Sequence, residues 1–174
     1  VIVLCSACSP IQMVRGIVNT KLHFEEIRPH IAKLPSGKMK YYSGGNGFPI
    51  IFIHGFGTNA LENWGMFMGD FKKTHRVFAP DLYWFGKSRP TNANLIGTPE
   101  EQADAIADFM RFHGLQKAHI VGTSFGGYVA LAFALRHPAS VGRLVIADGA
   151  GLAPTTTERK GIMKAFAHVK GDLG

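Results

Sequence analysis

The pentapeptide Gly122-Thr123-Ser124-Phe125-Gly126 lies between two apolar stretches of different character. The run at 118–121 is short and suits a buried strand, whereas Gly127 and the residues up to 135 are typical of a helix. A chain that turns sharply from a strand into a helix needs glycines beside the turn, because side chains there would clash. The pattern therefore predicts a strand–turn–helix unit that raises the Ser124 hydroxyl to the tip of the bend.

Chance is the alternative explanation for this pattern, since the chain holds 21 glycines in 174 residues. A second segment, His54-Gly55-Phe56-Gly57, argues against chance because it follows another apolar, strand-like run at 49–53. A loop in that place can aim a backbone N–H at a reacting carbonyl, so we expect the N–H groups of Phe56 and Phe125 to stabilise a negative oxygen beside Ser124. For His54 we favour a loop residue bonded to the backbone over a direct chemical role.

A third segment, Asp81-Leu82-Tyr83-Trp84-Phe85-Gly86-Lys87-Ser88, follows the strand-like run at 76–80. With the three segments in this order, the chain over about 38–152 resembles the α/β-hydrolase superfamily, and within it the monoacylglycerol-lipase-like esterases and lysophospholipases. Family members usually carry Pro and Gly where this chain has Tyr83 and Trp84, so we expect a bulkier loop that presses on the acyl pocket. The resemblance implies that Asp81 and Gly86 shape this loop and that Asp81 is not the catalytic acid.

A serine nucleophile also needs a base and a carboxylate that orients the base. The histidines after Ser124 are His137, which we expect to interact with the terminal carbonyls of the preceding helix, and His168, which we expect at the surface. The resemblance implies instead a histidine after a last strand that this sequence does not contain. Asp148 follows the apolar run at 143–147 and is either the catalytic acid or a loop-capping carboxylate, and we favour the cap.

Strand-like and helical segments alternate along the chain, which predicts an α/β fold with a mostly parallel sheet flanked by helices on both faces. One helix is predicted over 60–72, with three aromatic residues in the core at helical spacing: Trp64, Phe67 and Phe71. Another is predicted to open with Thr98 and Glu101 at capping-box spacing and to end near Gly114.

The resemblance implies a domain longer than 174 residues, so we expect an N-terminal part of the fold, truncated before its last strands. We expect a hydrophobic N-terminal segment at 1–20, the hydrolase core at 21–154 and the start of a cap at 155–174. The edge at 143–147 would then be open to aggregation, and the chain by itself would show little or no turnover.

The first eight residues look like the end of a hydrophobic signal segment, and Ser6-Ala7-Cys8 resembles the end of a bacterial lipobox. A lipid-modified Cys8, a cleaved or uncleaved hydrophobic segment and an ordinary strand all stay open. A signal or lipobox would place the protein at a membrane, in the periplasm or outside the cell. Otherwise we expect it in the cytoplasm.

The amino-acid composition limits the classes of partner that we expect for this chain. Hydrophobic residues make up 46% of the chain and charged residues 18%, which suits one globular domain. The net charge of +7 comes from scattered bases, which argues against nucleic acid and favours peripheral contact with anionic lipid. No nucleotide-binding glycine loop or metal-ligand cluster is evident, so neither a cofactor nor a metal is expected. Oligomeric state stays open.

The favoured function is a serine hydrolase of carboxylic esters, in which Ser124 forms an acyl-enzyme. The resemblance implies lipid esters such as monoacylglycerols or lysophospholipids. A serine-type C–C bond hydrolase and a cofactor-free haloperoxidase stay open within the same fold. A noncatalytic or truncated family member that serves as a binding module is the alternative from a different class.

Overall fold

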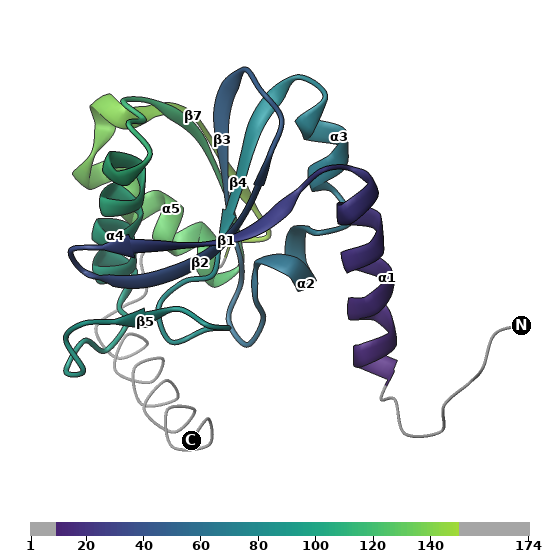
Figure 1. The fold of residues 1–174 in the computed structure, drawn as a ribbon. Coiled ribbons are helices and arrows are strands. Elements are labelled where there is room, and N and C mark those ends of the chain that lie inside the picture. The colour runs from purple at the N-terminus through teal and green to yellow at the C-terminus, as the bar shows by residue number, and fades with distance from the viewer. Residues whose placement is uncertain (1–9, 150–174) are drawn as a thin grey trace, which may run out of the picture.

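The computed structural model describes residues 10–149 of the chain. The helices and strands follow one another as Figure 1 shows. The helices are α1 (Pro10–Phe24), α2 (Ala60–Trp64), α3 (Met68–Lys72), α4 (Pro99–Phe112) and α5 (Phe125–Arg136), with a 3₁₀ turn η1 (Pro138–Ser140). The strands are β1 (Arg28–Leu34), β2 (Gly37–Gly44), β3 (Phe48–Ile53), β4 (His75–Pro80), β5 (Arg89–Pro90), β6 (Ala118–Thr123) and β7 (Val141–Ala147).

The strands form one sheet with the order β1-β2-β4-β3-β6-β7, and β5 pairs with β2 outside this path. Strands β4, β3, β6 and β7 are parallel, whereas β2 is antiparallel to β1, β4 and β5. The register sets Ile53 beside Gly122 and Thr123 beside Ala147. The carboxyl ends of β3, β6 and β7 therefore meet at one edge, which is where ligands bind in such sheets.

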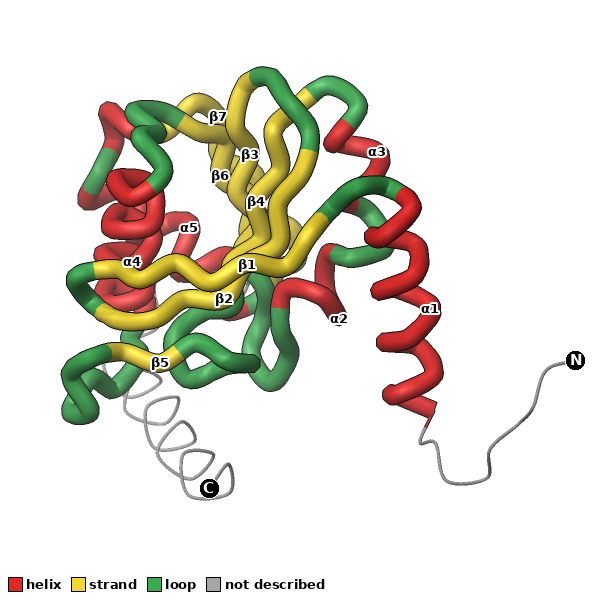
Figure 2. Tube along the Cα trace, in the orientation of Figure 1, coloured by secondary structure: helices red, strands yellow, loops and turns green. Residues whose placement is uncertain are grey.

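Helices cover both faces of this sheet (Figure 2), which confirms the predicted fold class. Successive residues of β3 point to opposite faces, so Ile51 and Ile53 join the core under α4 and α5. Ile50 and Phe52 join the second core, under α1, α2 and α3. Burial on both faces explains why the strand reads as a continuous apolar run rather than an alternating one.

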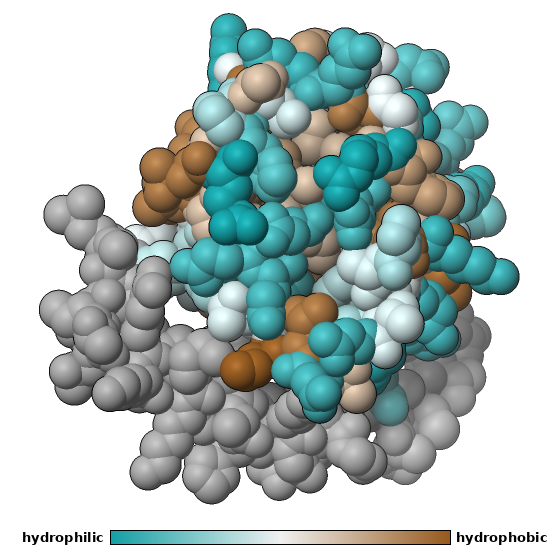
Figure 3. Space-filling view, turned by 90° about the vertical axis from the view of Figure 1, so that its left-hand side faces the viewer, coloured by the Kyte–Doolittle hydropathy of each residue, from teal (hydrophilic) through white to brown (hydrophobic). Residues whose placement is uncertain are grey.

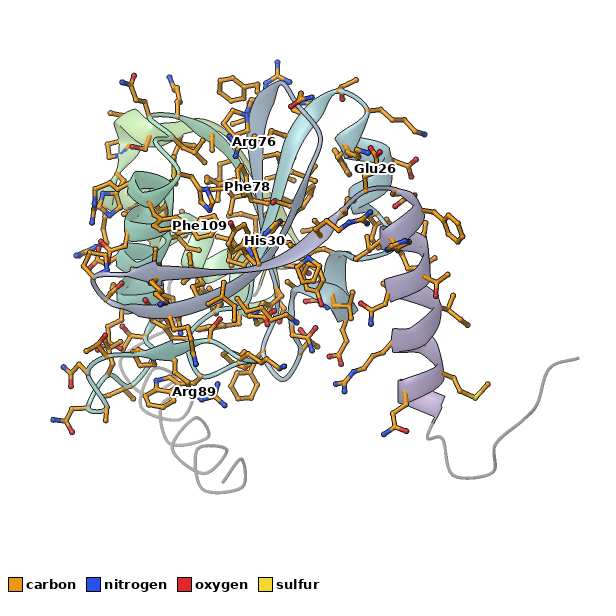
Figure 4. The ribbon with its side chains drawn as sticks, viewed as in Figure 1. Glu26, His30, Arg76, Phe78, Arg89 and Phe109 are labelled. Atoms are coloured by element: carbon orange, nitrogen blue, oxygen red, sulfur yellow. The ribbon has the colours of Figure 1, made fainter. Side chains whose placement is uncertain are left out.

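Aromatic rings fill the core between β4 and α4. The ring centroids of Phe78 and Phe109 are 5.7 Å apart, and the Arg76 guanidinium lies 4.8 Å from the centre of the Phe78 ring (Figure 4). On the α4 side of the molecule the surface is mostly hydrophilic, and the hydrophobic residues form separate small patches (Figure 3). Helix α4 therefore packs one face inward and presents the other to solvent.

The ends of α4 follow the prediction. The Thr98 hydroxyl accepts a hydrogen bond from the Glu101 N–H, and the Glu101 carboxylate accepts one from the Thr98 N–H, which completes the capping box. Beyond the other end, Gly114 has a φ of +65°, which favours glycine.

The predicted helix over 60–72 is wrong, because the segment forms two short helices, α2 and α3. Helix α2 ends at Gly65, where a Cβ atom would lie 2.3 Å from the Val18 side chain of α1. The break separates the three aromatic residues. Trp64 still packs on Phe52, with 5.0 Å between ring centroids, but Phe67 is 57% and Phe71 41% exposed.

Helix α1 crosses residue 20, which is the predicted boundary between the N-terminal segment and the hydrolase core. Its Val18 and Leu22 are both buried in the core beneath it. Met13, Val14 and Ile17 on the same helix are exposed. Residues 1–9, with Cys8, and the predicted cap at 155–174 lie outside the described residues. In the part that the structure does describe, no helix is long and apolar enough to cross a membrane.

Strand β7 is at one end of the sheet among the residues described, and its Val145 and Ile146 side chains are exposed. This is the strand for which the sequence predicts aggregation, and that consequence stays a prediction.

The capping box of α4 makes a stability prediction. Replacing Thr98→Ala removes the hydroxyl that accepts from Glu101 and lowers the free energy of unfolding by about 1 kcal/mol. Thr98→Ser keeps the hydroxyl and serves as the matched control. Urea denaturation of the full-length protein checks this, and equal midpoints for Thr98→Ala and wild type would contradict it.

Candidate active site

The turn between β6 and α5 places Ser124 at the tip of a sharp bend, with φ of +50° and ψ of −121°. Such a backbone is strained for any residue with a side chain, and it persists because the surroundings leave no alternative. A Cβ atom on Gly122 would lie 2.1 Å from the Gly126 carbonyl oxygen, and one on Gly126 would lie 2.3 Å from that of Ile53. Glycine is therefore required on both sides of Ser124, and the serine itself is exposed.

The loop after β3 lies against this turn. A Cβ atom on Gly55 would be 3.2 Å from Cβ of Ser124, so the two backbones are close neighbours. The Gly55 N–H donates to Oδ1 of Asn63 at 2.7 Å, and the Thr58 hydroxyl lies 3.0 Å from the same oxygen. Asn63 belongs to α2, and no motif in the sequence selects it, although its partner Gly55 is only eight residues away in the loop before that helix.

The two predicted oxyanion donors belong to the two segments that meet at Ser124. Phe125 follows Ser124 directly as the first residue of α5, and Phe56 follows Gly55 in the loop that contacts Ser124. Their rings are near one another, with 6.4 Å between centroids. Gly57, with a φ of +73°, turns the loop away after Phe56.

His54 is buried and uses both ring nitrogens. Nε2 accepts the Leu82 N–H at 2.9 Å, so Nδ1 carries the proton and donates to the Gly55 carbonyl at 2.7 Å. Burial lowers the pKa of His54 to about 4 from the ordinary 6.5, because the charged ring would lose its hydration. His54 is thus a neutral link between the loops after β3 and β4, with no nitrogen left to act on Ser124.

Asp81 performs a similar structural task in the loop after β4. Its Oδ1 accepts the N–H of Ala60, the first residue of α2, at 2.9 Å. Gly86 has a φ of +51°, and a Cβ atom there would lie 2.1 Å from Oδ2 of Asp81. Burial raises the pKa of Asp81. The Asp81 carboxylate therefore links its loop to α2, and the loop itself encloses the carboxylate.

That Tyr83 and Trp84 press on the acyl pocket stays a prediction, and the structure shows the partners of each side chain. Tyr83 is fully buried in the core and its hydroxyl lies 2.8 Å from the Ser36 hydroxyl. Trp84 has a φ of +74°, and its indole N–H donates to the Leu95 carbonyl at 3.0 Å. Phe85 is the member of this aromatic run that faces the site, where its ring lies 5.2 Å from that of His54.

Asp148 lies one strand away from Ser124. It follows β7 directly, and the Ser124 N–H donates to the carbonyl of the preceding Ala147 at 3.3 Å. Asp148 is exposed and has a φ of +52°. Gly127 allows the start of α5 to approach β7, since a Cβ atom there would lie 3.0 Å from the Ile146 side chain.

His137 is remote from this site, because it follows the far end of the 12-residue helix α5, a length of about 18 Å. Its backbone N–H donates to the Phe133 carbonyl near the end of α5 at 2.8 Å, as expected of a residue that interacts with the terminal carbonyls, whereas its ring is directed to α4. Its Nε2 is 3.3 Å from Oδ1 of Asp104 on α4, and Arg136 binds the same carboxylate at 2.9 and 2.8 Å. His168 lies outside the described residues. Between residues 10 and 149, no three metal-ligating side chains come together.

The buried neutral state of His54 predicts a pH dependence of stability. Its folded pKa of about 4 is below the unfolded value of 6.5, so its contribution is present above pH 6.5 and is lost as the pH falls towards 4. The loss is about 3 kcal/mol in free energy of unfolding. Denaturant titrations at several pH values should give a flatter profile for His54→Gln than for wild type.

His113 supplies the matched control, because burial also lowers its pKa to about 4 at a place remote from the turn. His113→Gln should flatten the profile separately, and the double variant should be flatter than either single one. A His54→Gln profile that parallels wild type would show that His54 is not buried in its neutral form.

Comparison with known proteins agrees with this geometry. Residues 49–169 match the family described as alpha/beta hydrolase fold. A 2-hydroxymuconate semialdehyde hydrolase from Pseudomonas sp. (strain CF600) is 39% identical over 120 residues, which cover 67% of this chain and 42% of the relative. Lipase 1 from Psychrobacter immobilis is 35% identical over 123 residues, covering 68% of this chain and 38% of the relative. The chain thus spans less than half the length of these two relatives.

Solved structures give the same result. The crystal structure of a membrane phospholipase A, described as a bacterial virulence factor, superposes with a TM-score of 0.74 at 27% identity. The superposition covers 87% of this chain and 51% of the phospholipase. From the family match and these similarities, the chain belongs to the α/β-hydrolase superfamily.

Proposed function

We propose that this chain carries the nucleophile and oxyanion site of a serine hydrolase that cleaves carboxylic esters. The observation that carries the proposal is the exposed Ser124 on a strained turn, with the loop of Gly55 and Phe56 packed against it. A strained backbone that holds one polar side chain towards the carboxyl edge of a parallel sheet is a feature of functional sites.

In the proposed reaction Oγ of Ser124 attacks the acyl carbon and passes its proton to a general base. The carbonyl oxygen becomes negative, and the N–H groups of Phe56 and Phe125 stabilise it. The alcohol leaves with that proton, and water then releases the acid from the acyl-enzyme. We propose that the base comes from outside the described residues, since His54 has both nitrogens engaged and His137 is remote.

Lipid esters are the proposed substrates. Support comes from the apolar rings of Phe56 and Phe125 beside Ser124, and from the similarity to Lipase 1 and to a phospholipase A. We also propose peripheral contact with anionic lipid. The exposed Met13 and Ile17 on α1 and the net charge of +7 support this contact.

A C–C bond hydrolase is the second candidate. Relatives named 2-hydroxymuconate semialdehyde hydrolase and 2-hydroxy-6-oxo-2,4-heptadienoate hydrolase are 39% and 34% identical to this chain. A ketone carbonyl would occupy the same oxyanion position as an ester carbonyl. The bond that breaks next to that carbonyl is C–C in one case and C–O in the other, so the substrate decides between them.

A serine-directed fluorophosphonate on the full-length protein tests the nucleophile. We expect one labelled residue, Ser124, and complete loss of labelling and turnover in Ser124→Ala. Ser140→Ala, in η1 beyond α5, is the matched control and should label as wild type does. A folded protein that does not label would point instead to a binding module.

Substrate class is then measured on the same preparation. We expect release of acid from p-nitrophenyl and monoacylglycerol esters at rates well above those on a 2-hydroxy-6-oxo-dienoate. The opposite order would replace the ester hydrolase by the C–C hydrolase, while leaving Ser124 as the nucleophile.

A further inference from the structure

Three consecutive aromatic residues in the loop after β4 contact three different parts of the molecule. Tyr83 enters the core and meets Ser36, and Trp84 donates to the carbonyl of Leu95. Phe85 contacts the loop after β3. The left-handed backbone of Trp84, at φ of +74°, lies between the two buried neighbours and is strained for a residue with a bulky side chain.

Phe85 is the inner member of a row of rings that ends at the nucleophile. Its ring is edge-on to His54, at 5.2 Å and 77°, and edge-on to Phe56, at 5.6 Å and 85°. Phe56 is in turn edge-on to Phe125, at 6.4 Å and 83°. These geometries are the favoured ones for aromatic pairs. The row therefore joins the loops after β3 and β4 to the turn that holds Ser124.

Phe85 is the anchor of this row because it is buried and its backbone is fixed. Its side chain is 8% exposed, whereas that of Phe56 is 36% exposed. The Phe85 N–H donates to the Leu82 carbonyl at 3.1 Å, and its own carbonyl accepts from Ser88 at 3.0 Å. Phe56, by contrast, sits between two glycines, of which Gly57 has no atom within 4 Å of a Cβ position. The Phe56 N–H belongs to the same planar peptide as the Gly55 carbonyl, which accepts from His54 Nδ1 at 2.7 Å and from the Thr58 hydroxyl at 3.0 Å. Phe85 therefore packs both on the residue that holds this carbonyl, His54, and on the Phe56 ring.

We propose that Phe85 is a positioning residue for acyl transfer: its ring braces both His54, which holds the Gly55 carbonyl, and the Phe56 ring, and so keeps the N–H of the Gly55–Phe56 peptide aimed at the oxyanion. The inference rests on the proposed serine hydrolase function. A donor must be in place before charge develops, and a small displacement of such a group costs a large factor in rate. Truncating Phe85 should therefore act on the transition state rather than on binding of the substrate.

The test compares Phe85→Leu with Phe85→Tyr and Phe133→Leu in the full-length protein. Phe85→Leu removes the ring, Phe85→Tyr keeps it, and Phe133→Leu truncates a fully buried aromatic on α5 that is absent from the row. We expect Phe85→Leu to lower kcat about tenfold with KM within about twofold of wild type. Phe85→Tyr should recover most of that loss, and Phe133→Leu should lower stability without changing kcat in the folded protein.

Fluorophosphonate labelling distinguishes the two ways of failing. If wild type labels at Ser124 and Phe85→Leu keeps the wild-type kcat, the positioning role is overturned and the serine hydrolase stands. The positioning role is also overturned, and the serine hydrolase stands, if Phe133→Leu and Phe85→Leu lower kcat equally, because the loss of rate would then come from lower stability of the fold. If folded wild type does not label at all, both the hydrolase proposal and the positioning role fall together.

Discussion

The contact of three backbone segments around Ser124 is the constraint on which the rest of the site depends. The end of β3, the end of β6 and the start of α5 approach so closely that only hydrogen fits in place of a side chain at Gly122 and Gly126. The chain leaves β6 with a left-handed residue for that reason, and the residue in the bend is a serine. The same approach puts Gly55 beside Ser124, so one packing constraint positions both the proposed nucleophile and the loop next to it.

A closed set of buried polar contacts keeps these loops in register. His54 joins the loop after β3 to the loop after β4, Asp81 joins the latter to α2, and Asn63 joins α2 back to Gly55. The site needs these three side chains for its geometry, even if none of them takes part in the reaction. A buried polar group is costly when it loses its partner, so each of these hydrogen bonds favours the observed arrangement of the loops. The aromatic row of Phe85, Phe56 and Phe125 covers it.

Local signals in the sequence were sufficient for strands β3, β4, β6 and β7, for the turn at Ser124 and for α4, whose cap lies within four residues of its first turn. They did not predict β1, β5 or helix α1. The features that the sequence missed depend on partners far along the chain. Val18 of α1 leaves no room for a side chain on Gly65, directly after α2, and His137 turns to Asp104 because α5 packs on α4. Tyr83 lies in the core and its hydroxyl meets Ser36, a partner 47 residues away along the chain that no local signal indicates.

The central claim is that the three sequence segments build one acyl-transfer site around Ser124. A crystal structure of the full-length protein after reaction with a fluorophosphonate tests it most directly, because the phosphoryl oxygen stands in for the oxyanion. We predict a covalent bond to Oγ of Ser124 and a phosphoryl oxygen about 2.7–3.1 Å from the backbone nitrogens of both Phe56 and Phe125. An adduct on another residue, or an oxygen that contacts neither nitrogen, would contradict the account.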